Sequence, residues 1–129
     1  MRGYVINIEK ETLDNELFRK VLFTANYSQL VLMSLKPNEE IGEEVHGLDQ
    51  FFRFESGNGK VVLNGEEAEI SDGFAVVVPA GTIHNVINTS ADKPLKLYTI
   101  YSPPNHQDQI IHATKAEAVE EHFDGKVSF

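Results

Sequence analysis

The chain has 129 residues, 41% of them hydrophobic, and carries 11 lysines and arginines against 20 aspartates and glutamates, a formal net charge of −9. This length suits one domain with one core, which we expect to span residues 1–129, and the negative charge excludes nucleic acid as a partner. No apolar run approaches the roughly 20 residues of a membrane helix, and with no cysteine any metal ion must be held by nitrogen and oxygen.

The first segment is polar and is followed by two apolar runs. Residues 1–16 turn acidic before any apolar stretch of signal-peptide length, which favours a cytoplasmic location over secretion. Residues 17–35 then hold the two apolar runs, separated by Asn26, Tyr27 and Ser28. This pattern predicts a pair of strands that ends before Pro37.

The middle of the chain alternates strand and turn patterns. Residues 43–55 alternate well enough for a half-buried strand, in which Gly47 allows a kink or a bulge. A turn follows at residues 57–59. Residues 61–70 then predict a hairpin, because Asn64-Gly65 favours a two-residue turn.

Residues 73–88 place a histidine next to a rigid turn. Val76, Val77 and Val78 predict a buried strand, a Pro-Gly turn follows at residues 79–81, and His84 begins a second strand. After Pro94, residues 95–102 predict a last long strand. Because strands recur with no helix between them, the predicted fold class is all-β, as an antiparallel sandwich or barrel.

The C-terminal loop and helix are predicted at about residues 103–123. Thr114 and Glu117 have the spacing of a capping box, which predicts a short helix packed outside the barrel. The preceding loop would border the barrel mouth. We expect His106 and His112 at the surface, with a role in gating or acid-base chemistry as a further hypothesis.

Side chains that alternate on a strand predict a candidate metal site. Glu44, His46 and Gln50 have the same parity as Phe52 and Phe54, so on a regular strand all five face the barrel interior. Two adjacent strands can bring several nitrogen and oxygen donors to one point, which predicts a site where Glu44 and His46 face His84. One of Tyr98 and Tyr101 should also point inward, and their parity does not decide which.

Two motifs resemble those of the cupin family. The pattern G-x5-P-x-G-x2-H-x3-N is matched in full, at Gly73, Pro79, Gly81, His84 and Asn88. The first cupin motif, G-x5-H-x-H-x3,4-E-x6-G, resembles residues 38–59 with substitutions. His46 matches its second histidine, whereas its opening glycine, first histidine and glutamate are replaced by Asn38, Glu44 and Gln50.

The sequence leaves open the register of the first motif and the role of Gln50. A second register makes His46 the first histidine and puts Leu48 in the next slot, which removes a ligand, so we prefer the first. For Gln50, an amide buried and bonded to backbone is an alternative to a metal ligand.

The resemblance implies a single cupin barrel, a jelly-roll-like double-stranded β-helix with a short C-terminal helix. It further implies one divalent ion (iron, manganese, nickel, cobalt or zinc) bound by Glu44, His46, His84 and Gln50, and a small polar ligand, sugar-like or a carboxylate. The overall pattern resembles cupins grouped with mannose-6-phosphate isomerase-like proteins, which suggests a Lewis-acid isomerase. The alternatives are a non-catalytic binding or sensing module and an iron-dependent dioxygenase. No catalytic residue is assigned, and a homodimer is expected, in contact through the apolar runs of residues 17–35.

Overall fold

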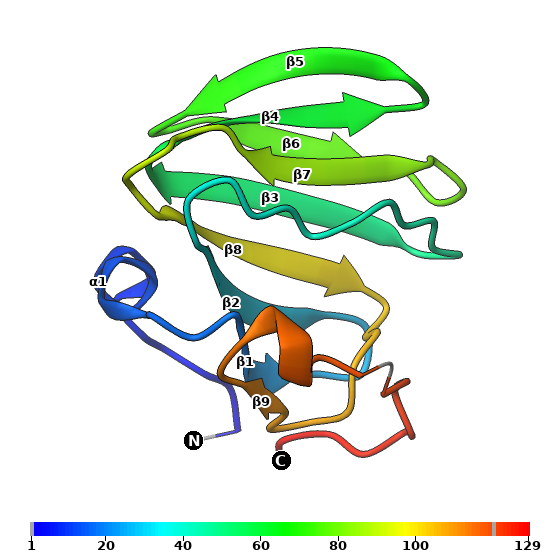
Figure 1. The fold of residues 1–129 in the computed structure, drawn as a ribbon. Coiled ribbons are helices and arrows are strands. Elements are labelled where there is room, and N and C mark those ends of the chain that lie inside the picture. Colours follow the sequence, from blue (N-terminus) through cyan, green and yellow to red (C-terminus); the bar gives the residue numbers. More distant parts are fainter. Residues whose placement is uncertain (1, 120) are drawn as a thin grey trace.

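The computed structural model describes residues 2–119 and 121–129, and within them the chain forms two antiparallel β-sheets (Figure 1). One sheet has the strand order β6-β3-β8-β2-β1-β9 and the other has the order β5-β4-β7. The predicted all-β fold is confirmed. The strands are β1 (Arg19–Thr24), β2 (Gln29–Leu35), β3 (Asp49–Ser56), β4 (Asn58–Leu63), β5 (Glu66–Ser71), β6 (Ala75–Val78), β7 (His84–Asn88), β8 (Leu95–Ser102) and β9 (Ile111–His112).

Several predicted elements lie where the sequence places them. The strand pair within residues 17–35 is β1 and β2, and β8 covers the whole of residues 95–102. The predicted hairpin is β4 with β5, whose turn residues Asn64 and Gly65 have φ angles of 49° and 84°. Both angles lie in the left-handed region that this tight turn requires.

The core fills the space between the two sheets. Along β8 the buried side chains alternate with partly exposed ones, so Tyr101 points inward and Tyr98 does not. Phe52 and Phe54 of β3 are buried, as predicted. The three valines of β6 were predicted to form a buried strand, but Val77 is 65% exposed. β6 lies at the edge of its sheet and buries one face only, with Val76 and Val78 inside.

The segment before β3 is irregular, which corrects the predicted strand over residues 43–55. The strand begins at Asp49, and Glu44 forms an isolated bridge with His84 instead. Gly47 lies between these two parts, where the sequence allows a kink. The side chains of Glu44 and Gln50 therefore do not share one regular strand.

The helices differ from the sequence-based expectation. A helix that we did not predict, α1 (Ile8–Asp14), begins at Asn7, whose side chain accepts a hydrogen bond from the Lys10 amide, and it packs on β8, β3 and β2. The C-terminal helix is a single 3-10 turn, Lys115–Glu117. The predicted capping box is absent there, because the Thr114 side chain caps nothing and Glu117 accepts a bond from the Ala113 amide. The part of the prediction at residue 120 lies outside the described residues.

No helix within the described ranges is both long enough and apolar enough to cross a membrane.

Candidate functional site

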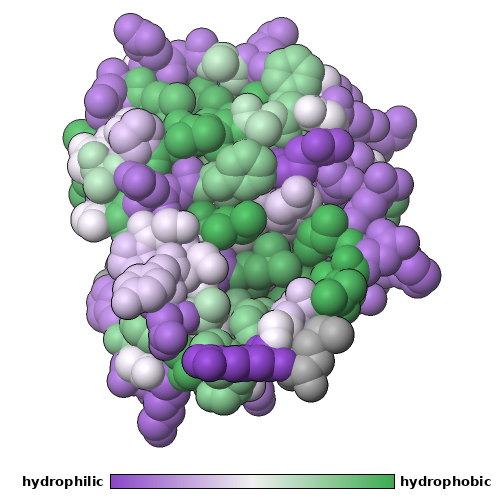
Figure 2. Space-filling view, turned by 180° about the vertical axis from the view of Figure 1, so that it is seen from behind, coloured by the Kyte–Doolittle hydropathy of each residue, from purple (hydrophilic) through white to green (hydrophobic). Residues whose placement is uncertain are grey.

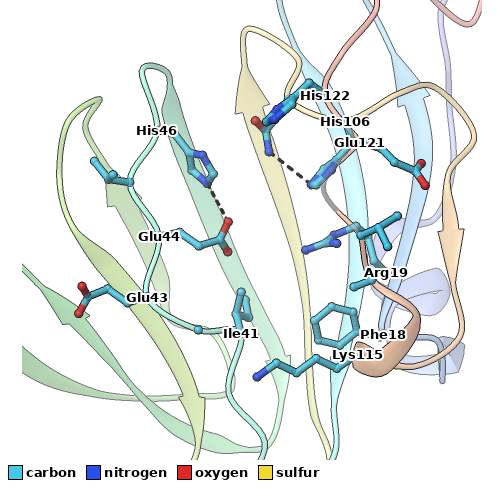
Figure 3. A pocket seen from close by; sticks show the side chains of 15 residues that line it. Phe18, Arg19, Ile41, Glu43, Glu44, His46, His106, Lys115, Glu121 and His122 are labelled. Atoms are coloured by element: carbon cyan, nitrogen blue, oxygen red, sulfur yellow. Dashed lines mark hydrogen bonds and ion pairs between the residues drawn. The ribbon is translucent and has the colours of Figure 1, made fainter.

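A cavity of about 500 Å³ opens between the segment that precedes β3 and the first residues of β1 (Figure 3). Ile41, Glu44 and His46 line one wall. Phe18 and Arg19 line the opposite wall, together with the loop after β8 and the C-terminal segment. The cavity therefore combines an apolar lining with charged side chains from both walls.

Backbone pairing brings Glu44 and His84 side by side. The Glu44 amide donates to the His84 carbonyl at 2.8 Å, and the His84 amide donates to the Glu44 carbonyl at 2.9 Å. The His84 Nδ1 lies 2.9 Å from the Thr82 carbonyl oxygen. Because a carbonyl can only accept, Nδ1 is the donor in this contact, and this orientation leaves Nε2 as the nitrogen that a metal ion would bind.

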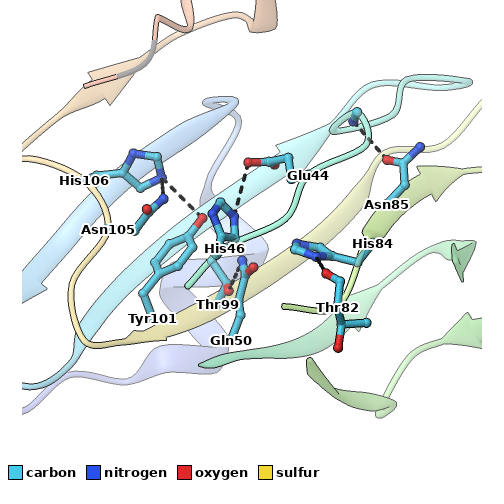
Figure 4. A network of polar contacts seen from close by, with 11 residues as sticks. Glu44, His46, Gln50, Thr82, His84, Asn85, Thr99, Tyr101, Asn105 and His106 are labelled. Atoms are coloured by element: carbon cyan, nitrogen blue, oxygen red, sulfur yellow. Dashed lines mark hydrogen bonds and ion pairs between the residues drawn. The ribbon is translucent and has the colours of Figure 1, made fainter. Parts of the chain in front are cut away.

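His46 faces both of these residues (Figure 4). Its ring centroid lies 5.3 Å from that of His84, and its Nε2 lies 3.3 Å from Glu44 Oε2. This distance is that of an ion pair, but Nε2 is buried without a well-aligned hydrogen bond. The Gly81 amide donates to the His46 carbonyl at 2.8 Å, which ties this segment to the Pro-Gly turn.

Gln50 is buried, and one end of its side-chain amide is held by a hydrogen bond. Its Nε2 donates to the Thr99 hydroxyl at 3.0 Å, so the amide bonds to a side chain rather than to backbone. Its Oε1 is buried and has no hydrogen-bond partner. A buried acceptor without a partner costs about 1–3 kcal/mol, so this oxygen is suited to a bound cation or ligand donor.

These observations test whether the four predicted donors fit a divalent ion. Two imidazoles, a carboxylate and an amide oxygen are suitable nitrogen and oxygen donors, and two of their atoms lack hydrogen-bond partners. Across residues 2–119 and 121–129, however, no three His, Asp or Glu side chains have the spacing of a formed metal centre. The donor types fit an ion, whereas the spacing of the side chains in the described residues is not that of a complete coordination sphere.

The charge of Glu44 is set by its neighbours. Burial alone would raise the pKa of this carboxyl, but the contact with His46 and the positive charge of Arg19 outweigh it and lower the pKa. Glu44 is therefore ionised at neutral pH, and its carboxylate is available to a cation or to a proton donor.

Two polar residues in or near the opposite wall, Tyr101 behind His106 and Arg19, were given no role in the sequence analysis. Tyr101 is 2% exposed, and its hydroxyl lies 3.3 Å from His106 Nε2. Burial raises the pKa of Tyr101, so the phenol stays protonated. Arg19 is 7% exposed and lines the cavity itself. No motif marks either residue, because their approach depends on strands that are distant in the sequence.

The expectation that His106 and His112 lie at the surface is wrong. Both are buried, because the chain after β8 folds back along β2 and β1. Gln29 holds this loop: its side chain accepts from the His106 amide at 2.9 Å and donates to the His106 carbonyl at 2.8 Å. His112 Nδ1 lies 3.4 Å from Arg19 Nη1.

His106 is expected to make stability depend on pH. Burial, together with the positive charge of Arg19, lowers the pKa of His106 from 6.5 to about 3. Between these values the unfolded chain binds a proton there that the folded chain does not, so stability is full above pH 6.5 and falls as the pH drops. The slope from this group is on the order of 1 kcal/mol per pH unit.

Urea unfolding of wild type and His106→Gln between about pH 5 and pH 6.5 checks this expectation. The variant should show the shallower dependence of unfolding free energy on pH. Equal slopes for the two proteins would contradict it.

Comparisons with known proteins agree with this architecture. Residues 31–101 match a family model described as "Cupin domain". The chain is 47% identical to Uncharacterized protein YrkC of Bacillus subtilis (strain 168) over 125 residues, which cover 92% of this chain and 67% of that protein. It is 46% identical to Uncharacterized protein L612 of Acanthamoeba polyphaga mimivirus over 108 residues, which cover 80% and 67%. The crystal structure of BH2720 from Bacillus halodurans superposes with a TM-score of 0.87 at 46% identity, over 90% of this chain and 92% of that one.

Proposed function

This chain belongs to the cupin family, and we propose that it binds a small polar metabolite in the cavity between the segment that precedes β3 and the start of β1, and one divalent metal ion next to this cavity. Glu44, His46 and His84 would hold the ion, with Gln50 as a fourth donor. The observation that carries the proposal is the cluster in which His46 Nε2 lies 3.3 Å from the Glu44 carboxylate and the His46 ring lies 5.3 Å from that of His84, whose Nδ1 is already engaged. Iron, manganese, nickel, cobalt and zinc all accept such donors.

A bound ion would supply Lewis acidity to polarise a carbonyl or hydroxyl of the metabolite. The residues of the chain have separate tasks in this proposal. The Thr82 carbonyl orients His84, Thr99 anchors Gln50, and the ionised Glu44 can accept a proton if it is not itself a ligand.

Two reaction classes use this donor set. An isomerase similar to mannose-6-phosphate isomerase-like proteins would move a proton between carbon atoms of a sugar-like substrate. An iron-dependent dioxygenase would need ferrous iron with two histidines and a carboxylate. Oxygen consumption by the ferrous-loaded protein in the presence of substrate separates the second class from the first.

A second candidate function is ligand binding without metal or turnover. The observation that favours it is the spacing of the acidic and histidine side chains in the described part of the chain, where no three form a metal centre. In that case Glu44 and His46 act as an ion pair that contacts the ligand directly. Carboxylate or sugar binding that is unchanged by chelator treatment would support this function.

Replacing Glu44 with glutamine tests the metal proposal. A neutral amide is a weaker donor than a carboxylate, so the dissociation constant for Mn²⁺ or Zn²⁺ should rise about tenfold. Calorimetric titration of chelator-stripped protein measures this constant and should find one ion per wild-type chain.

Glu69→Gln is the matched control, because it removes the same charge from an exposed position on β5. Its affinity should equal that of the wild type. Weak binding of several ions per chain, or the same loss in both variants, would refute a site at Glu44.

We also propose a homodimer. Edge-to-edge contact through β2 is ruled out, because β1 and β8 pair with its two edges. Apolar side chains gather on the face seen in Figure 2, between hydrophilic borders, which offers a contact between faces. Sedimentation at micromolar concentration should give twice the mass of the chain, and a monomeric mass would refute the proposal.

A further inference from the structure

Arg19 is a buried cation that the proposed metal site does not use. It is the first residue of β1, is 7% exposed and lines the cavity across from Glu44 and His46 (Figure 3). Its Cζ lies 5.2 Å from the centroid of the Phe18 ring, which packs on the guanidinium. The side chain is thus held in place by the protein rather than exposed to water.

The hydrogen bonds of Arg19 are incomplete. Nη1 lies 3.4 Å from His112 Nδ1, but Nε is buried without any hydrogen-bond partner. No carboxylate of the described residues lies within ion-pair distance of this guanidinium. Buried arginines are normally paired, because an unpaired charge in a low-dielectric site is costly.

The remaining cation of the lining is already engaged. Lys115 Nζ donates to the Glu40 carbonyl at 2.6 Å and lies at an exposed position, where water can satisfy its other donors, whereas the free Nε of Arg19 is buried. The facing wall carries Glu43 and Glu44, and Glu121 also lines the cavity. A dianion such as phosphate would therefore meet several carboxylates, whereas one carboxylate matches one guanidinium.

We propose that Arg19 binds the carboxylate group of the metabolite and so determines that the ligand is a small carboxylic acid. The edge of the guanidinium that carries Nε presents two donors to the two oxygens of a planar carboxylate. The rest of the ligand would extend across the cavity toward Glu44, His46 and His84. This inference rests on the proposed function for the location of the ligand, but the contact with Arg19 needs no metal ion.

The test uses paired ligands that differ only in charge. Propionate, lactate and succinate are titrated by calorimetry into chelator-stripped wild-type protein, each against its uncharged amide, with inorganic phosphate as a second anion. At least one carboxylate should bind at least about tenfold more tightly than its amide and than phosphate. No carboxylate binding, equal binding of acid and amide, or a preference for phosphate would overturn the inference.

Variants then assign the effect to Arg19. Arg19→Gln should weaken carboxylate binding about tenfold or more. The affinity of Arg19→Lys should lie between those of Arg19→Gln and wild type, because lysine keeps the positive charge but cannot form two parallel hydrogen bonds to a carboxylate. Unchanged binding by Arg19→Gln would overturn the inference. If either variant unfolds, the comparison of acid with amide in the wild type still decides the question.

The two proposals can fail separately. In metal titration, Arg19→Gln should still bind one ion per chain as the wild type does, because Arg19 is not among the proposed donors. Carboxylate binding that depends on Arg19 in a protein that binds no metal would refute the metal site and leave this inference standing. Metal binding without any carboxylate binding would refute this inference and leave the metal site standing.

Discussion

Replacing Asn88 with alanine is expected to lower the free energy of unfolding by about 3 kcal/mol. Asn88 is 1% exposed, and its Nδ2 donates to the carbonyls of Leu35, Lys36 and Lys93 at 3.2, 3.0 and 2.9 Å. Its Oδ1 accepts from the Ser90 amide at 3.0 Å. One side chain therefore joins the ends of β2 and β7 to the loop before β8, and alanine would leave these backbone groups without partners.

Asn85→Ala is the matched control, since Asn85 lies on the same strand and accepts a single bond, from the Gly42 amide. It should cost about 1 kcal/mol. Asn88→Asp should be at least as harmful as Asn88→Ala, because a carboxylate would face three carbonyls with no proton to donate. Urea unfolding measures all three, and equal losses for Asn88→Ala and Asn85→Ala would contradict this role of Asn88.

Replacing His46 and His84 together with alanine is expected to weaken divalent metal binding by at least about a hundredfold. Losing a residue that only supports a ligand typically costs 10–100-fold in affinity, so losing two direct donors should cost more. Neither imidazole belongs to the apolar core, so the variant should stay folded. Titration of chelator-stripped protein with Mn²⁺ and Zn²⁺ measures the affinity, and thermal unfolding measures the fold.

His106→Gln is the matched control, because it removes a buried imidazole from the opposite wall of the same cavity. Its metal affinity should stay within a few-fold of wild type. If His106→Gln loses as much affinity as the double variant, the ion does not depend on the pair formed by His46 and His84.

The second motif predicted most of the fold around the site. The turn at Pro79 and Gly81 places His84 at the start of β7, and Asn88 closes the far end of that strand. These features are local, so turn chemistry and spacing were enough to predict them. Strand alternation likewise predicted the inward direction of Phe52 and Phe54, because β3 is regular there.

The first motif predicted that Glu44 and His46 face His84, but the regular strand assumed in that prediction is not present. Glu44 and Gln50 were expected on one strand, whereas backbone bonds to His84 hold Glu44 in an irregular segment. The pairing across to β7 compensates for the lost strand, so Glu44 and His46 still face His84. The alternation of side chains along a strand does not predict this arrangement, because the alternation no longer fixes which way a side chain points once the strand is interrupted.

The second wall of the cavity could not be predicted from the sequence. Arg19 stands beside Lys20 at the start of β1, so its charge does not single it out, and β9, which brings His112 beside it, has only two residues. His106 is buried because Gln29, distant in the sequence, holds both backbone groups of this residue. Such contacts depend on tertiary structure, and no local pattern marks them.

The central claim is that His46 and His84 share one ion, and a crystal structure of metal-loaded protein tests it most directly. An anomalous difference map at the absorption edge of the metal should show a single strong peak about 2.0–2.3 Å from one nitrogen of each imidazole, with an oxygen of Glu44 or Gln50 beside it. A peak elsewhere, or fully loaded crystals with no peak between the two imidazoles, would contradict the account.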